Sequence, residues 1–167
     1  TCIVMGKTVT EYHGKYKGII VSKTNMRNLR KELQAKMTEI SDFIIFRFEQ
    51  IGEEAVKTAR DSGRYNDITG NLRSSIGYVI LYDGKVMSQG GFKPTNGKKG
   101  NGDKGIQEGL AFLDKLKAKF PWGIALVLCA GMEYAAYVEY HKDLDVLHSA
   151  EQITEKLVNE LLDGIAK

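Results

Sequence analysis

Apolar residues recur at helical spacing through the first third of the chain. Between positions 25 and 60 they follow one another at steps of three and four, which is the repeat of one face of an α-helix. The row comprises Leu29, Leu33, Met37, Ile40, Ile44, Phe48, Ile51 and Ala55. Such a helix is ~50 Å long at ~1.5 Å per residue, which is long for a small domain. Phe43 and Phe46 widen its apolar face, and Asp61-Ser62-Gly63 is predicted to end it, with Gly63 in the left-handed conformation.

The length of 167 residues favours one domain, which we place at residues 25–167. Residues 1–24 carry little helical pattern, and Ile19-Ile20-Val21 predicts a short strand, so this segment is interpreted as an N-terminal arm or edge strand. A hydrophobic fraction of 43% argues against disorder of the whole chain. The first residues do not resemble a signal peptide, and no apolar run approaches the ~18 residues of a membrane span.

Two stretches of alternating apolar residues predict antiparallel hairpins. The alternation at positions 76, 78, 80 and 82 leads into Asp83-Gly84, which supplies the positive φ angles of a type I′ turn. Residues 76–82 and 85–90 therefore form the first predicted hairpin. Residues 122–129 are a strongly apolar strand, and the alternation over residues 134–140 predicts a partner strand after a turn, which gives a second hairpin.

Two further helices complete the predicted fold. An apolar row at positions 106, 110, 113 and 120 marks a helix of about 15 residues, with Asp103 as its N-cap. A last helix is predicted from Ser149, where Ser-Ala-Glu-Gln is a capping-box pattern. The order is α–β–β–α–β–β–α. This is an α+β domain in which a long N-terminal helix and two further helices pack on one face of an antiparallel sheet built from two hairpins.

Residues 93–104 (KPTNGKKGNGDK) contain almost no apolar residue and are predicted to be a flexible Lys/Gly surface loop. Lys98, Lys99 and Lys104 are candidates for phosphate contacts, which would be independent of base sequence and sensitive to salt. A non-enzymatic nucleic-acid-binding module is therefore one alternative function. The loop has no interleaved aromatic residues for stacking on bases, so a solvated loop that becomes ordered only on assembly is the favoured interpretation.

The net charge is only +3, but its distribution is uneven. Residues 85–119 hold eight lysines against three acidic residues, a balance of +5. Residues 121–167 hold three lysines against eight acidic residues, a balance of −5. Attraction between the basic surface of one copy and the acidic surface of the next is one consequence. Two solvated surfaces without a partner are the other interpretation, which charge alone slightly favours.

Motifs for cofactor or metal binding are weak. Residues 100–105 spell GxGxxG before a helix, but a dinucleotide site needs a buried strand directly before the motif and an acidic residue about twenty positions later. Neither is present in the sequence. Cys129 ends an apolar run and is predicted to be buried, and Cys2 lies far from it in sequence. Without a CxxC pair we expect no zinc site.

A small metal or acid–base site is a second alternative. Glu139, His141, Asp145 and His148 lie close together in sequence and carry suitable side chains. They fall between a predicted strand and a predicted helix start, so a polar rim is the favoured interpretation. No serine follows the GxSxG pattern, and no histidine lies in a recognisable triad neighbourhood. We therefore expect no enzymatic activity, no cofactor and no metal.

Two short motifs carry the remaining information. They are Thr69-Gly70-Asn71-Leu72-Arg73-Ser74-Ser75-Ile76, before the first hairpin, and Tyr134-Ala135-Ala136-Tyr137-Val138-Glu139-Tyr140, beyond the lysine-rich loop. In this order and spacing, residues 25–167 resemble the tail-completion (head–tail joining) proteins of long-tailed bacteriophages. That family has a Thr-Gly-x-Leu-[Arg/Lys]-x-Ser-[Ile/Val] segment after a long helix, and later a strand reading Tyr-Ala-x-x-[Val/Leu]-Glu-[Tyr/Phe]. The chain departs from the family at His141-Lys142, where Gly-Thr and a proline-rich segment are usual.

The resemblance implies a virion structural protein, assembled in the bacterial host cytoplasm, that forms a ring at the head–tail junction and joins the capsid connector to the tail. Its partners would be further copies of itself and other neck, connector and tail-tube proteins, with DNA in the channel as a further candidate and no membrane. A ring uses heterologous contacts, in which one surface meets a different surface of the next copy.

The proposed ring suggests candidate interface residues. They are Arg73, Tyr78, Tyr82, Tyr134, Tyr137 and Glu139. Amphipathic aromatic side chains are enriched at interfaces, although tyrosines that cap the core with the hydroxyl in water are the alternative. Arg73 is expected to point outward while Leu72 and Ile76 anchor the first motif in the core.

Overall fold

A computed structural model describes residues 2–4, 7–12, 18–21, 25–142 and 144–165, and only the backbone for residues 2–21, 141 and 142 within these ranges. Contacts divide the chain into two compact units, residues 1–43 and 44–167. The helix α1 (Met26–Ser62) begins in the first unit and ends in the second. Its bounds confirm the long N-terminal helix that the apolar row predicts.

The first unit holds a small antiparallel sheet and the beginning of α1. The strands β1 (Cys2–Val4), β2 (Lys7–Tyr12) and β3 (Gly18–Val21) pair in the order β1-β2-β3. Strand β3 contains the short strand predicted at Ile19-Ile20-Val21. Asn25 caps α1, because its side-chain oxygen accepts a hydrogen bond from the backbone N–H of Arg27 at 3.1 Å.

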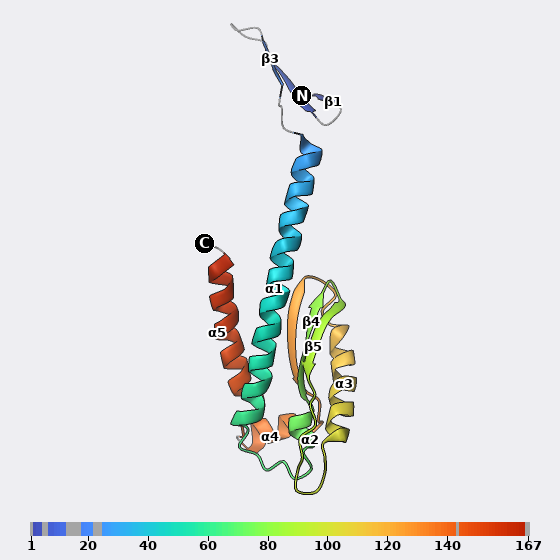
Figure 1. The fold of residues 1–167 in the computed structure, drawn as a ribbon, viewed down its shortest axis with the longest axis vertical. Coiled ribbons are helices and arrows are strands. Elements are labelled where there is room, and N and C mark those ends of the chain that lie inside the picture. The colour runs from blue at the N-terminus through green and yellow to red at the C-terminus, as the bar shows by residue number, and fades with distance from the viewer. Residues whose placement is uncertain (1, 5–6, 13–17, 22–24, 143, 166–167) are drawn as a thin grey trace. The chain divides into compact units, whose positions relative to one another are not determined.

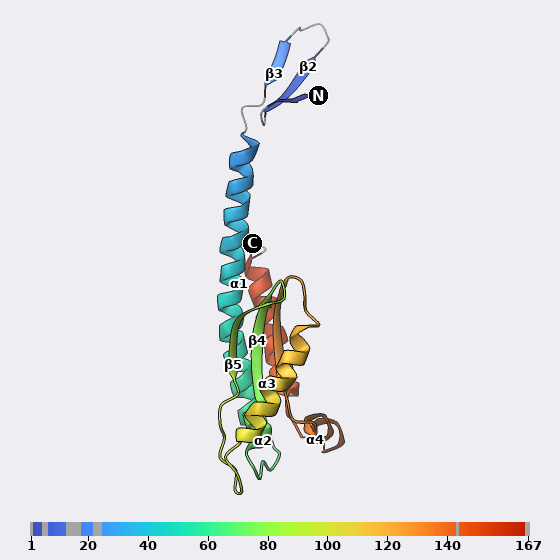
Figure 2. The ribbon, with the colours of Figure 1, turned by 90° about the vertical axis from the view of Figure 1, so that its right-hand side faces the viewer.

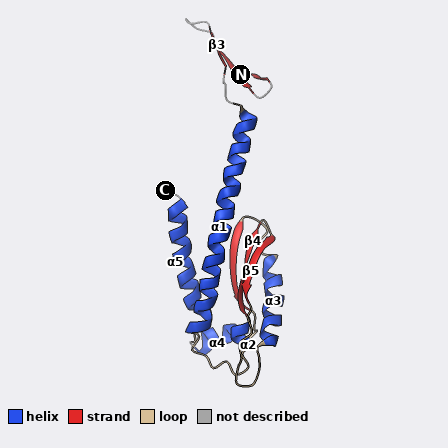
Figure 3. Cartoon of the chain, viewed as in Figure 1, coloured by secondary structure: helices blue, strands red, loops and turns tan. Residues whose placement is uncertain are grey.

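A three-stranded antiparallel sheet forms the centre of the second unit (Figure 3). Strand β4 (Ile76–Tyr82) lies between β5 (Lys85–Gly91) and β6 (Ile124–Ala130). The predicted β4–β5 hairpin is confirmed, with φ angles of 47° at Asp83 and 74° at Gly84 in its turn. Strand β6 pairs with the other edge of β4, and the chain reaches it through the helix α3 (Asp103–Lys117).

Helices cover both faces of this sheet, so the prediction of a single covered face is wrong (Figure 1). Ile76 and Ile80 of β4 pack in a core cluster with buried residues of α1 and of α5 (His148–Ile165). Val79 and Leu81 point to the opposite face and pack with Leu113 of α3, which lies in front of the sheet in Figure 2. The reason is that β4 is apolar at consecutive positions, so both of its faces need cover.

The strand predicted at residues 134–140 is a helix, α4 (Ala135–Lys142), so the second hairpin is also wrong. Ala135 is buried and Val138 is partly buried. These two residues are three positions apart, so they lie on the same helical face, which packs against the protein. The three tyrosines 134, 137 and 140 have the same spacing and are all exposed. Strand-like alternation in this segment therefore coexists with a helical repeat, and the packing selects the helix.

Helix ends differ in detail from the sequence prediction. Gly102, with a φ of 79°, is the N-cap of α3, and Asp103 is the first helical residue. Gly63 does not adopt the left-handed conformation that was expected after α1. Helix α5 confirms the predicted C-terminal helix, although it starts at His148 and Ser149 lies within its first turn.

Candidate functional site

The two sequence motifs meet at one end of the second unit, where α2 (Asn71–Ser74) and α4 lie (Figure 1). Leu72 of the first motif and Ala135 of the second belong to one core cluster with Tyr65. The backbone N–H of Gly131 donates a hydrogen bond to the carbonyl oxygen of Ser75 at 3.1 Å. Sequence spacing did not predict this proximity, because it depends on β6 pairing with β4.

Gly70 lets the first motif approach the lysine-rich loop. Its φ is 75°, and a Cβ at this position would collide with the carbonyl oxygen of Thr95. The backbone N–H of Thr95 donates to Ser74 Oγ at 2.8 Å, and that of Lys99 donates to the carbonyl oxygen of Ile68 at 2.9 Å. The loop is thus hydrogen-bonded to the chain on both sides of Gly70, which composition did not predict.

The lysines of this loop sit on a defined turn. The backbone N–H of Gly97 donates to the carbonyl oxygen of Gly100 at 2.8 Å, which closes the turn around Lys98 and Lys99. Both lysine side chains are exposed, as is Lys104 in the first turn of α3. We call residues 97–100 the lysine turn. Its backbone is held by hydrogen bonds, so two positively charged side chains project from a defined place on the second unit.

Arg73 turns back onto the end of α1, contrary to the outward orientation predicted for it. Its Nε donates to the carbonyl oxygen of Arg60 at 3.1 Å, and its Nη2 donates to that of Gly63 at 2.8 Å. The guanidinium also lies 4.7 Å from the ring centroid of Tyr65. The Arg60 carbonyl belongs to the last turn of α1, where it has no partner inside the helix, and the Gly63 carbonyl directly follows that helix. Arg73 thus takes the place of a left-handed Gly63 in capping α1.

Tyr65, beneath Arg73, is a buried aromatic residue, with 6% of its surface exposed. Its hydroxyl has no hydrogen-bond partner among the residues that the structure describes. Burial raises the pKa of Tyr65 to about 12, against the opposing effect of the Arg73 charge. The hydroxyl therefore stays protonated throughout the neutral range.

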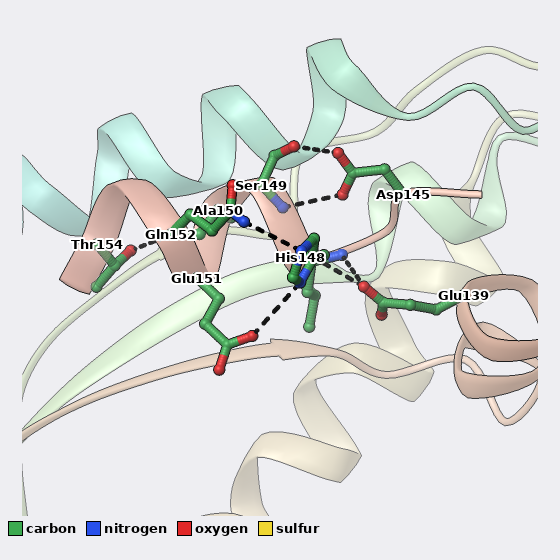
Figure 4. A network of polar contacts seen from close by, with 9 residues as sticks. Glu139, Asp145, His148, Ser149, Ala150, Glu151, Gln152 and Thr154 are labelled. Carbon is green, nitrogen blue, oxygen red and sulfur yellow. Dashed lines mark hydrogen bonds and ion pairs between the residues drawn. The ribbon is translucent and has the colours of Figure 1, made fainter. Parts of the chain in front are cut away.

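Two carboxylates cap the start of α5 (Figure 4). Glu139 Oε1 accepts hydrogen bonds from the backbone N–H groups of Leu147 at 3.2 Å and His148 at 2.8 Å. Asp145 accepts the backbone N–H of Ser149 at 3.1 Å and also binds its hydroxyl. The predicted capping role of Ser149 thus belongs to Asp145 and Glu139, which satisfy donors that a helix N-terminus leaves unpaired.

Burial and hydrogen bonding act in opposite directions on the pKa of Asp145. Burial raises this pKa, but hydrogen bonds from the Ser149 side chain and backbone and from Ser62 outweigh that effect, and the charge of His148 adds to them. The net pKa lies below the usual value of 3.8. The carboxylate form of Asp145 is therefore the form that supports the folded helix start.

An open groove of about 950 Å³ lies beside these caps, between β6, α4 and α5. Its apolar part is lined by Leu128, Leu144, Leu147 and Val158, and its rim carries Glu151 and Glu155 of α5. Glu151 Oε2 is 3.9 Å from His148 Nδ1, and its side chain is 79% exposed. We call this feature the α4–α5 groove. It combines an apolar floor with a negatively charged rim.

The predicted interface tyrosines fall into two groups. Tyr78 is a core residue, 3% exposed, and its hydroxyl donates to Glu53 Oε1 at 3.2 Å, so it does not offer a surface to a partner. Burial raises its pKa to about 12, with Glu53 adding to the rise. Tyr82, Tyr134 and Tyr137 are exposed on the second unit. Their role in an interface stays a prediction.

The first half of α1 presents a feature that the sequence analysis did not select as a site. Four residues of the predicted row, together with Met26 one turn before it, have exposed fractions of 38–68%: Met26, Leu29, Leu33, Met37 and Ile40. At ~100° per residue these side chains lie on one helical face, the face that Phe48 and Ile51 bury further along the helix. We call these five residues the α1 apolar row. A contiguous exposed apolar surface of this kind is typical of a protein contact.

The second alternative, a metal or acid–base site, has little support from the arrangement of its candidate side chains. Glu139 and Asp145 are engaged as helix caps, and the side chain of His141 lies outside the described residues. Within the described ranges, no three His, Cys, Asp or Glu side chains are grouped as metal ligands. Nor does any helix there have the length and apolar character needed to cross a membrane.

Comparison with known proteins gave no match. No family model, curated protein or solved structure matches it. The resemblance to tail-completion proteins therefore depends on the two motifs and their setting.

Proposed function

We propose that the chain is a bacteriophage virion protein that forms a ring at the head–tail junction and joins the capsid connector to the tail. The observation that carries the proposal is the α1 apolar row, because five large apolar side chains exposed on one helical face call for a protein partner. In this proposal the chain acts by contact with other copies and with neck and tail proteins, and catalyses no reaction.

The meeting of the two motifs supports the family assignment. The family pattern has a Thr-Gly segment and a Glu-aromatic segment, and in the second unit these segments share one core cluster. The second segment is the helix α4 here, whereas it is a strand in the family pattern. Gly70, Arg73 and Glu139 each have a contact that explains their residue type: close backbone approach, a helix C-terminus and a helix N-terminus. These contacts are a reason for such residues to recur together in a common fold.

The test is assembly in the phage that encodes the chain. Without the chain, we expect electron micrographs to show filled heads and separate tails, and complementation in the host to restore joined particles. The double variant Leu33→Ser with Met37→Ser is expected to leave the second unit folded but not to restore joining. The matched control, Val86→Ser with Met87→Ser, alters two similarly exposed apolar residues on β5 and should complement. Joined, infectious particles in the absence of the chain would refute the proposal.

The nucleic-acid-binding module stays a second candidate because Lys98 and Lys99 project from a fixed turn. It predicts binding to duplex DNA that weakens steeply as salt increases. Replacement of both lysines by alanine should abolish that binding. Absence of DNA binding at low salt would remove this candidate.

A further inference from the structure

We propose that the α4–α5 groove of one copy binds the lysine turn of the next copy. This contact would join neighbouring copies in the proposed ring, so the inference rests on the proposed function. Both features lie on the second unit, and they share no residue. The groove is lined by residues of β6, α4, α5 and the segment between the two helices, whereas the lysine turn lies beside Ile68, to which Lys99 is hydrogen-bonded. Each copy therefore offers two separate surfaces.

Charge and shape favour a lysine as the occupant. A lysine side chain has an apolar stem of four carbons and a positively charged end. The floor of the groove offers Leu144, Leu147 and Val158 to such a stem, and the rim offers Glu151 and Glu155 to the ammonium groups. The groove volume of about 950 Å³ lies within the range of pockets that bind small molecules, so it can take two such side chains.

The lysine turn is suited to the same contact from the other side. The Gly97–Gly100 hydrogen bond and the Lys99–Ile68 hydrogen bond hold its backbone before any partner binds. Less conformational entropy is therefore lost on docking than with a free loop. Among the described residues, neither Lys98 nor Lys99 forms an ion pair with Glu151 or Glu155 of the same copy. Both charge sets stay available to another copy.

Such a contact is heterologous, because a turn on one copy meets a groove on another. Repetition of a heterologous contact closes into a ring when the rotation between copies allows it. The inference thus gives a physical basis for the uneven charge of the sequence, in which residues 85–119 have a balance of +5 and residues 121–167 a balance of −5.

Charge reversal tests the contact in the full-length chain. Lys98→Glu with Lys99→Glu alters the turn, and Glu151→Lys with Glu155→Lys alters the groove. We expect each double variant to weaken self-association about tenfold or more at low salt, measured by sedimentation velocity, since two pairs change from attraction to repulsion. A chain carrying all four substitutions, and an equal mixture of the two double variants, should both recover association, because each restores opposite charges at every contact.

The matched controls change the same charge elsewhere. They are Lys115→Glu with Lys119→Glu on and after α3, and Glu160→Lys with Asp163→Lys on α5 but outside the groove. These should leave association within about twofold of the unaltered chain, because exposed charges far from a contact are screened. Circular dichroism would show that every variant is folded.

Three outcomes overturn the inference. A chain that stays monomeric at low salt has no such contact, and association that both reversals leave unchanged uses another surface. Loss of DNA binding in the turn variant with association intact assigns the lysines to nucleic acid. The proposed function is decided separately by the joining of heads and tails, so rings that persist in both reversal variants would refute this contact and leave that function standing.

Discussion

Removal of the Glu139 carboxylate should destabilise the second unit even in a monomer. In Glu139→Ala, the backbone N–H groups of Leu147 and His148 lose the acceptor that they have at 3.2 and 2.8 Å. Loss of a helix cap costs about 0.5–2 kcal/mol, and a hydrogen bond to a charged group contributes about 1.5–3 kcal/mol. We therefore expect the free energy of unfolding to fall by about 2 kcal/mol. Glu139→Gln keeps an oxygen acceptor without the charge and should lose about half as much.

The measurement is urea unfolding followed by circular dichroism. A loss of about 2 kcal/mol corresponds to a fall in Tm of about 4–8 °C for a chain of this size. Glu151→Ala is the control, because Glu151 lies on the same groove but is 79% exposed and caps no helix, so its loss should stay within about 0.5 kcal/mol. If Glu139→Ala unfolds at the same urea concentration as the unaltered chain, the capping role is refuted.

Four further outcomes follow from the same contacts. Gly70→Ala should cost about 2 kcal/mol or more, measured by thermal melting, whereas Gly123→Ala, with a similar φ of 74° but open space around it, should cost about 1 kcal/mol from backbone strain alone. Arg73→Ala should lower the free energy of unfolding by about 2 kcal/mol, because two carbonyls at and just after the end of α1 and an aromatic face lose their partner. Burial raises the pKa of Cys129 to about 12, so with the other cysteine replaced by serine its thiol should resist Ellman's reagent at pH 8 until the chain is unfolded. The folded state lowers the pKa of Asp145 below the unfolded value of 3.8, so the Asp145 carboxylate stabilises the folded chain above pH 3.8, and this stabilisation is lost as the pH falls below that value. The difference in unfolding free energy between the unaltered chain and Asp145→Asn should therefore become smaller in acid.

Elements with local signals could be predicted from the sequence. The long helix α1 follows from a row of apolar residues at steps of three and four, and the β4–β5 hairpin follows from Asp83-Gly84 between two apolar stretches. Cover on both faces of the sheet was also within reach. The run from Ile76 to Tyr82 is apolar at almost every position, which is the pattern of a strand buried on both faces, whereas the hairpin prediction rests on only every second residue.

Other features depended on contacts between distant segments. Residues 134–140 carry a strand-like alternation and a helical repeat together, and only the cluster around Leu72 and Val146 selects the helix. Arg73 and Glu139 were selected by motif, but their partners lie at the end of α1 and the start of α5, so their capping roles could not be predicted before those ends were placed. The α4–α5 groove likewise exists only where β6, α4 and α5 come together.

The sequence by itself determined the long helix, the first hairpin, the last helix and the separation of basic from acidic residues, because each depends on neighbours along the chain. Tertiary structure alone decided that β6 joins β4, that α4 is helical, that the lysine turn is held in place and that a negatively charged groove opens between β6, α4 and α5. Periodicity shows which side of a segment is apolar, but the segment it packs against is chosen by burial of that side among elements far apart in sequence.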